Sequence, residues 1–414
     1  MMAAMGEANG KEREVLGRPD FDTLRERAFN LRWATVDKGV IPLTAADPDF
    51  PAPQAAVAAI ADYLRAPHLC YGPAAGLPEF RNAVARRFRE HKGASSMTSA
   101  RIIAANSAAS AVALTAAHLL QPGDEVVVQD PVDFLVAESA RRTGASLRHW
   151  QLSNDRFTLD GLAAAVTKKT RMLMVCHPHN PLGLLWDQDE VVAIAKFCCD
   201  RGIALLADEV WSDVVLDGAL FFSFAACADD KRAPWVVYGL SKGYGLAGLR
   251  IGAIIAPTEE EAERLCATAG FDQTIEGAAT LSQIAATGAL THGALWLEEF
   301  LRHCAAQRDM AIARLSALRG VRIGQKPSAT FVLFVDVRGT GLDEAEAARR
   351  IEQYARVRVV PGSPRWFGPG AAGHVRFSLA TTRDVLDEAL SRIERAWPQI
   401  THGCDRRLDS LQDL

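Results

Sequence analysis

The stretch GLSKGYGLAGLRIG, residues 239–252, decides between two folds for this chain. It contains a literal G-x-G-x-x-G, Gly243 to Gly248, shortly after the apolar run WVVYG (235–239), and this pattern after a strand indicates a dinucleotide site. A dinucleotide site also requires that the glycines open a helix and that an acidic residue follows about 20 positions later. Here another strand pattern, LRIGAIIAP, follows at once and leaves no room for a helix. The context therefore favours Lys242, just before the glycines, as the functional residue.

The composition is typical of a globular protein with a large core: 414 residues, 49% hydrophobic and 23% charged. A net charge of −4 argues against nucleic acid or an anionic membrane surface as partner. No run approaches the ~18 apolar residues of a membrane span, and the N-terminus lacks the apolar core of a signal peptide. The eight cysteines have no C-x-x-C spacing, which is typical of reduced thiols. We expect a cytoplasmic protein.

From about residue 100, short β-branched runs alternate with helical patterns such as 189–202, where Gly202 is a suitable end. This order predicts an α/β fold with a mostly parallel sheet covered on both faces. The expected strands are 101–105, 124–129, 171–176, 203–208, 235–239 and 251–256.

After about residue 290 the pattern changes to a long helix followed by a smaller α/β unit, with strands at 331–337 and 374–380 and helices at 343–355 and 382–397. We therefore predict four parts: an N-terminal segment (1–49) that packs on the small domain, a large domain (50–290), a small C-terminal domain (291–400) and a polar tail (401–414).

Lys242 has neighbours that suit a lysine forming a Schiff base with pyridoxal phosphate, which needs an anion site nearby. Ser241 can donate to a phosphate oxygen, and Arg250 adds a planar two-pronged donor. The alternative is a solvated loop lysine beside a structural arginine.

The pattern S-K-x-x-x-x-x-G-x-R-x-G, from Ser241 to Gly252, resembles the lysine signature of class I/II aminotransferases, which are fold-type-I pyridoxal-phosphate enzymes. Five motifs follow the family's order, from TAADPDFPAP (44–53) to HVRFSLATTRDVLDEAL (374–390). The resemblance implies a large domain with a mostly parallel seven-stranded sheet, a smaller α/β domain, pyridoxal 5′-phosphate as cofactor and a homodimer with shared active sites.

Two further motifs imply contacts with the cofactor ring. In HPHNPLG (177–183), Asn180 matches the residue that hydrogen-bonds the cofactor's 3′-oxygen, and in ADEVWSD (207–213), Asp208 matches the partner of the pyridine nitrogen. Trp211 stands where the family usually has tyrosine. Cys176, His177 and His179 also resemble metal ligands, but two prolines make this a rigid turn and no further ligands are nearby. We expect no metal.

The phosphate and substrate motifs depart from the family in several places. Ser107 and Ala108, in ANSAASA (105–111), match a strand-to-helix turn whose N–H groups bind phosphate, although glycine is usual at 107. Gly239 replaces a common serine or threonine. Tyr71 matches the tyrosine that reaches the neighbouring subunit's phosphate, and Arg376 matches the arginine that binds the substrate α-carboxylate.

DPVDF (130–134) leaves two possibilities open. The family places an aromatic ring, stacked on the pyridine, at the position of Asp133. Either Phe134 stacks on the ring through a shift of one residue, or the Asp133 carboxylate faces the cofactor, which would indicate a specialised substrate.

The reaction also has alternatives. Lys242 would release the cofactor to an amino acid and act as general base at its α-carbon. YGPAAGLPEF (71–80) favours an aminotransferase acting on an L-amino acid, whereas VIPLTAADPDF and PGSPRWFGPGAAGHVRF resemble bacterial cystathionine-type C–S β-lyases. We predict a PLP-dependent aminotransferase; a C–S β-lyase and a specialised PLP cyclase or eliminase are the alternatives.

Overall fold

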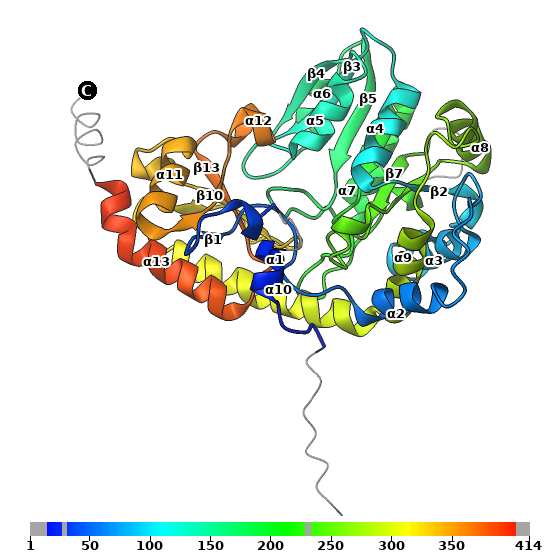
Figure 1. Cartoon of the computed structure of the whole chain (residues 1–414). Helices are drawn as coiled ribbons and strands as arrows, with labels where there is room; N and C mark the ends of the chain where they lie inside the picture. Colours follow the sequence, from blue (N-terminus) through cyan, green and yellow to red (C-terminus); the bar gives the residue numbers. More distant parts are fainter. Residues whose placement is uncertain (1–14, 27–30, 228–232, 403–414) are drawn as a thin grey trace, which may run out of the picture.

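The computed structural model describes residues 15–26, 31–227 and 233–402. Its main feature is a seven-stranded sheet with the order β2-β8-β7-β6-β5-β3-β4 (Figure 1). The strands are β2 (Ile102–Ala105), β3 (Glu125–Asp130), β4 (Ser146–Gln151), β5 (Thr170–Cys176), β6 (Ala204–Asp208), β7 (Trp235–Gly239) and β8 (Gly252–Ile255). β8 runs antiparallel to the two strands beside it, β2 and β7, and all the other pairings in the sheet are parallel. The expected mostly parallel α/β sheet is confirmed, and β4 is a strand that the sequence analysis did not predict.

Helices surround this sheet and bury its apolar strands on both faces. Helix α4 packs across β6, β7 and β8, while α7 packs on β6 and ends at Gly202, which has a left-handed φ of 65°. The helices are α2 (Gln54–Tyr63), α3 (Pro78–His91), α4 (Ala108–Leu119), α5 (Phe134–Arg141), α6 (Leu159–Ala165), α7 (Gln188–Arg201), α8 (Glu259–Thr268) and α9 (Thr280–His292). Among the helices in the described ranges, none combines the length and apolarity needed to cross a membrane.

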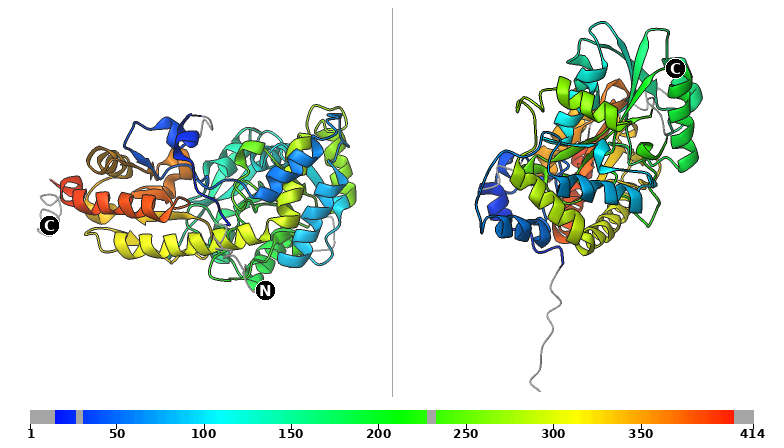
Figure 2. Two further views of the ribbon diagram at one scale, coloured as in Figure 1. Left: turned by 60° about the horizontal axis from the view of Figure 1, so that its bottom comes forward. Right: turned by 90° about the vertical axis from the view of Figure 1, so that its right-hand side faces the viewer.

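The long helix α10 (Ala294–Leu315) carries the chain from the large sheet to a second, four-stranded sheet with the order β12-β13-β10-β9 (Figure 1). This sheet forms its own hydrophobic core with α13, which lies beside α10 (Figure 2). The elements are β9 (Arg322–Ile323), β10 (Val332–Asp336), α11 (Glu344–Arg350), β12 (Val360–Pro361), α12 (Pro364–Phe367), β13 (His374–Ser378) and α13 (Arg383–Thr401).

The N-terminal segment lies against this second core. After α1 (Phe21–Glu26), strand β1 (Ile41–Pro42) pairs in parallel with β11 (Val357–Arg358), and Trp33 and Leu43 are buried in the core. The four predicted parts of the chain stay a prediction. Residues 1–14, and 403–414 of the predicted tail, lie outside the described residues.

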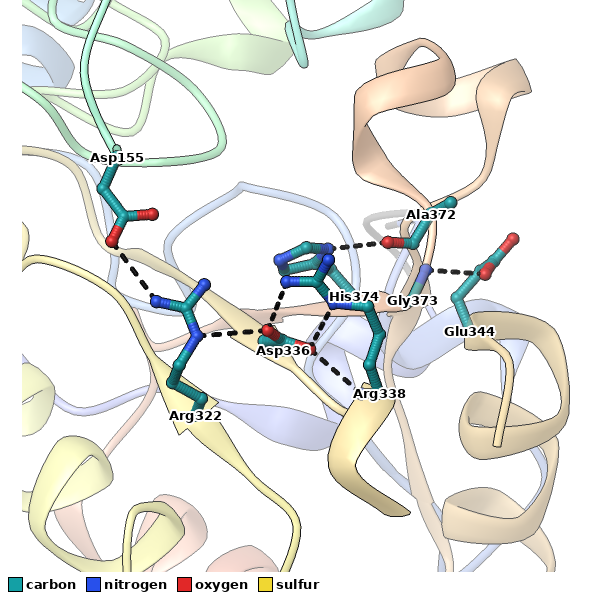
Figure 3. A network of polar contacts seen from close by, with 8 residues as sticks. All are labelled: Asp155, Arg322, Asp336, Arg338, Glu344, Ala372, Gly373 and His374. Atoms are coloured by element: carbon teal, nitrogen blue, oxygen red, sulfur yellow. Dashed lines mark hydrogen bonds and ion pairs between the residues drawn. The ribbon is translucent and has the colours of Figure 1, made fainter. Parts of the chain in front are cut away.

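A chain of ion pairs connects the loop after β4 to the second sheet (Figure 3). Asp155 lies 3.3 Å from Arg322 of β9, whose Nε lies 3.2 Å from Asp336 of β10. Beside them, the His374 ring stacks on Phe334 with centroids 4.6 Å apart. Exposed pairs of this kind stabilise by only about 0–1 kcal/mol. They join the loop after β4 to β9 and β10, and Asp336 is paired across the sheet with His374 at the start of β13, the strand that carries Arg376.

Candidate active site

A cavity of about 700 Å³ lies between the two sheets. Five charged side chains line it, and each one is a site residue predicted from the sequence: Asp133, Asp208, Lys242, Arg250 and Arg376. They come from the carboxyl ends of β3, β6 and β7 and from β13. In open α/β sheets, the carboxyl ends of parallel strands form the usual binding crevice.

Lys242 follows β7 in the loop that leads to β8. Its Nζ donates a 2.6 Å hydrogen bond to the carbonyl of Ala46 and lies 5.5 Å from the centroid of the Trp211 ring. Burial lowers the pKa of this amine. An amine with a lowered pKa holds its proton less firmly, which suits a base or nucleophile.

Ser107 and Arg250 form a second feature of the cavity. The Ser107 hydroxyl caps α4 by accepting a hydrogen bond from the Ser110 N–H at 3.1 Å, and Arg250 Nη2 donates to it at 2.9 Å. The N-terminus of α4, with the amide of Ala108, lies at the same place, and Ser241 lines the cavity nearby. A helix N-terminus beside an arginine and a hydroxyl is a site for a phosphate.

The backbone here explains the family's preference for glycine at position 107. Ser107 has φ 93°, a region that residues with a Cβ rarely occupy and that costs about 1–3 kcal/mol. Gly252 on β8 packs so closely that a Cβ would lie 2.7 Å from the Ala108 nitrogen. At Gly239 a Cβ would lie 3.0 Å from Ala108 Cβ, so a side chain there is sterically tight.

Asp208 ends β6 and points into the cavity from a buried position. Its Oδ1 accepts a hydrogen bond from the Val210 N–H at 3.1 Å, and burial raises the pKa of this carboxyl to about 7. A cationic ring nitrogen would lower that pKa again and stabilise the ionised carboxylate. Trp211 is buried beside it, edge-on to Phe331 with centroids 4.8 Å apart.

Asp133 and Phe134 both line the cavity but face different groups. Asp133 Oδ2 accepts a 2.9 Å hydrogen bond from Asn180 Nδ2 and lies 3.9 Å from Arg376 Nη1. Phe134 is 44% exposed, and its ring lies edge-on to Trp366 with centroids 5.3 Å apart. In this structure the Asp133 carboxylate therefore lies against Asn180 and Arg376, whereas the Phe134 ring lies toward α12.

Arg376 lies on β13 with its guanidinium buried in the cavity wall. Nη1 donates to Asn180 Oδ1 at 3.2 Å and Nη2 to the Thr44 carbonyl at 3.1 Å. Its Nε is buried and has no hydrogen-bond partner among the described residues. Buried donors are nearly always satisfied in folded proteins, so this group is suited to receive an anionic ligand.

The histidines of HPHNPLG are used in packing. The His177 ring stacks between Trp186 and Phe221, with centroids 5.3 and 4.9 Å away, and the His179 ring lies 5.1 Å from Phe157. Burial lowers the pKa of each imidazole to about 3. In the described ranges, no group of three or more His, Cys, Asp or Glu side chains is arranged to hold a metal ion.

The sequence analysis missed two contributions to the site. The carbonyls of Thr44 and Ala46 come from the N-terminal segment, whose resemblance indicates the family but assigns no site residue there. Outside this cavity, five residues after Asp208, the buried Asp213 carboxylate binds Lys92 at 2.8 Å and Arg87 at 3.0 Å. These two cations hold the pKa of Asp213 well below its usual value, although burial opposes them.

The chain matches the family model described as aminotransferase class I and II over residues 38–393. The chain belongs to the class I and II aminotransferases. An aspartate aminotransferase of Pyrococcus horikoshii is 30% identical to this aminotransferase over 86% of the chain and 90% of its own length. A cystathionine beta-lyase of Bacillus subtilis is 27% identical over 91% of the chain and 99% of its own length. The crystal structure of an aromatic aminotransferase from Pyrococcus horikoshii, 30% identical, superposes with a TM-score of 0.79, covering 88% of this aminotransferase and 97% of that chain.

This aminotransferase is an enzyme that uses pyridoxal 5′-phosphate, and the cavity fits that cofactor. The α4 N-terminus with Ser107 and Arg250 suits the phosphate, and the buried Asp208 suits the ring nitrogen. Lys242 Nζ lies in the same cavity. These groups come from separate elements and were brought together by the fold.

Proposed function

We propose that this aminotransferase removes the amino group of an L-amino acid, with Lys242 as the cofactor's attachment point and as the proton carrier. The observation that carries this proposal is the position of Lys242 Nζ: it is buried in one cavity with Asp208, Arg250 and Arg376. A solvated loop lysine would have neither this burial nor these neighbours.

The contacts in the cavity support the cofactor-binding roles that the family resemblance implies. Ser107, Ala108, Ser241 and Arg250 would hold the phosphate, and Asp208 the pyridine nitrogen. Asn180 and Trp211 would face the ring oxygen. When bound, the cofactor supplies an electron sink that stabilises negative charge at the substrate's α-carbon.

The protein's own residues orient the substrate and move the proton. Arg376 would bind the α-carboxylate in a bidentate manner, because its guanidinium is buried and its Nε is unused by the described residues. Lys242 then takes the proton from the α-carbon, and burial helps by lowering the pKa of its amine.

The experiment is to record the absorption spectrum of the purified protein and its Lys242→Ala variant, and to add amino acids while assaying keto-acid products. The proposal expects a cofactor band that changes when the lysine is removed, and a keto acid that matches the amino acid added. Lys242→Arg is the matched control, because it removes the primary amine but keeps the positive charge that Lys242→Ala loses. A wild-type spectrum identical to that of Lys242→Ala would refute the proposal.

A C–S β-lyase is the second candidate, favoured by the similarity to a cystathionine beta-lyase along 99% of that protein's length. A lyase would release pyruvate and ammonia from cystathionine or cystine, whereas an aminotransferase leaves the substrate's carbon skeleton intact. A cyclase would form neither pyruvate nor the matching keto acid, and an eliminase with another leaving group would release that group with ammonia and a keto acid that lacks it. The same product assay therefore separates the three reactions.

We also propose that the protein is a cytoplasmic homodimer with shared active sites. Tyr71 is 92% exposed, and residues 64–73 are exposed without interruption, although they include Leu69. Tyr71 does not line the cavity of its own chain. Mixing Tyr71→Ala with Lys242→Ala protein tests this, because a shared site predicts one restored site per mixed dimer. Sedimentation as a monomer would exclude the arrangement.

A further inference from the structure

We infer that the substrate of this aminotransferase is an amino acid whose side chain carries a positive charge, and that the Asp133 carboxylate recognises that charge. This inference rests on the proposed function, since it assumes that Arg376 binds the α-carboxylate. It identifies Asp133, which replaces an aromatic ring of the family, as the residue that determines the substrate class.

The first argument is the inventory of charges in the cavity. Four of the five charged residues that line it have a role once cofactor and substrate are bound: Lys242, Arg250, Asp208 and Arg376. Asp133 lines the same cavity, but no charged group of the cofactor or of the substrate's α-carbon would pair with its carboxylate. A charged group in a partly dry cavity is costly unless it meets a counter-charge.

The second argument is what surrounds the carboxylate. Its Oδ1 accepts from the Leu135 N–H at 3.2 Å and its Oδ2 from the Asn180 amide at 2.9 Å, and both donors are uncharged. The Arg376 guanidinium, 3.9 Å away, provides positive charge. When a substrate α-carboxylate binds Arg376, two carboxylates share that guanidinium. The ternary arrangement then lacks one positive charge, which a cationic side chain supplies.

The third argument is the fate of an acidic side chain. A second substrate carboxylate would meet Asp133, and the cationic residues of this chain that line the cavity already have the roles given above. Like charges at close range cost binding free energy. The cavity of one chain therefore disfavours aspartate and glutamate as substrates.

The cavity wall next to Asp133 also suits a cation. Phe134 follows directly in sequence, and its exposed ring lies near Trp366 of α12. Aromatic faces attract ammonium and guanidinium groups. Asp133, Phe134 and Trp366 line the same cavity, so its wall offers a carboxylate and aromatic surface to a cationic group with an apolar stem, such as the side chains of arginine, lysine and ornithine.

The test uses pairs of amino acids that differ in charge but little in shape: arginine against citrulline, and lysine against norleucine, with aspartate as a third class. We expect kcat/KM to be roughly 10- to 100-fold higher for the cationic member of each pair, the range of a charge-assisted hydrogen bond. In Asp133→Asn this ratio should fall to about 1. Asp160→Asn, an exposed aspartate on α6, is the matched control and should keep the wild-type ratio.

The outcomes are distinguishable from failure of the proposed function. Turnover of neutral amino acids with a ratio near 1, or a preference for aspartate, overturns this inference while the aminotransferase assignment stands. Calorimetric binding of arginine and citrulline to Lys242→Ala protein needs no turnover, so it tests recognition even if the catalytic assignment fails. Equal affinities there would also overturn the inference.

Discussion

The Arg250 guanidinium donates a hydrogen bond to the Ser107 hydroxyl at 2.9 Å, which ties the loop after β7 to the first turn of α4. The two residues are far apart in sequence, yet both line the cavity at the N-terminus of α4. The hydroxyl also caps the helix. The protein groups proposed to bind the phosphate are therefore already held together before any ligand arrives, which reduces the cost of binding.

Replacing Ser107 separates its hydroxyl from its backbone strain. Ser107→Ala and Ser107→Gly both lose the hydroxyl, so we expect each to raise the Kd for pyridoxal phosphate about tenfold. Glycine also relieves the φ of 93°, so the cofactor-free Gly variant should be more stable than the Ala variant by about 1–2 kcal/mol. Urea unfolding measures this difference. Equal stability of the two variants would show that the backbone is not strained.

Asp208→Asn should stabilise the cofactor-free protein at alkaline pH while impairing the loaded enzyme. Burial raises the pKa of Asp208 from 3.8 to about 7, so between these values the folded protein holds a proton that the unfolded chain has released. Stability then falls as pH rises through this window, by up to about 4 kcal/mol at pH 8. Asparagine stays neutral, so the advantage of the variant should grow from pH 5 to pH 8. Thermal unfolding of both apo-proteins checks the trend, with Asp160→Asn as control.

Arg376→Gln should weaken substrate binding without removing the cofactor. Losing the guanidinium removes the charged, bidentate partner of the α-carboxylate, so we expect kcat/KM for amino acids to fall about 100-fold or more. The absorption spectrum of the resting enzyme should stay close to wild type. Loss of the cofactor band in this variant would indicate that Arg376 acts on the cofactor instead.

Lys92→Met should destabilise the fold, because Lys92 is 1% exposed and binds the buried Asp213 carboxylate. Without Lys92, the Asp213 carboxylate keeps only Arg87 of its two cationic partners, and we expect a loss of about 3 kcal/mol in urea unfolding. Lys196→Met removes an exposed lysine that pairs with Asp200 and should change stability by less than about 0.5 kcal/mol. Similar losses for both variants would contradict this account.

The strands that build the site were predictable because they are buried on both faces and read as continuous apolar runs. Strand β4 was not, since it lies at the sheet edge and alternates between exposed and covered residues. Its sequence, SLRHWQ, has no β-branched residue, so the local preference for a strand is weak. Hydrogen bonding to β3 stabilises the strand conformation that the local sequence favours only weakly.

The side chains of the cavity were predictable from their motifs, whereas its backbone contacts were not. Any residue type at positions 44 and 46 offers the same carbonyl to Arg376 and Lys242, so the sequence carries no signal for these bonds. The Lys92–Asp213 pair joins residues distant in sequence, which single-sequence patterns do not connect. The orientation of Asp133 toward Asn180 depends on how α5 meets the HPHNPLG turn, a tertiary relationship.

The loop 240–251 leaves β7 at Gly239 and enters β8 at Gly252, and these two glycines are paired across the sheet. Both ends of the loop are therefore fixed in the sheet, and the number of residues between them limits the separation of Lys242 and Arg250, the proposed cofactor-attachment and phosphate-binding residues. The length of this loop therefore constrains the geometry of the cavity. Surface loops usually tolerate insertions and deletions, but in this loop such a change would move Lys242 relative to Arg250, so we expect it to impair the proposed cofactor site.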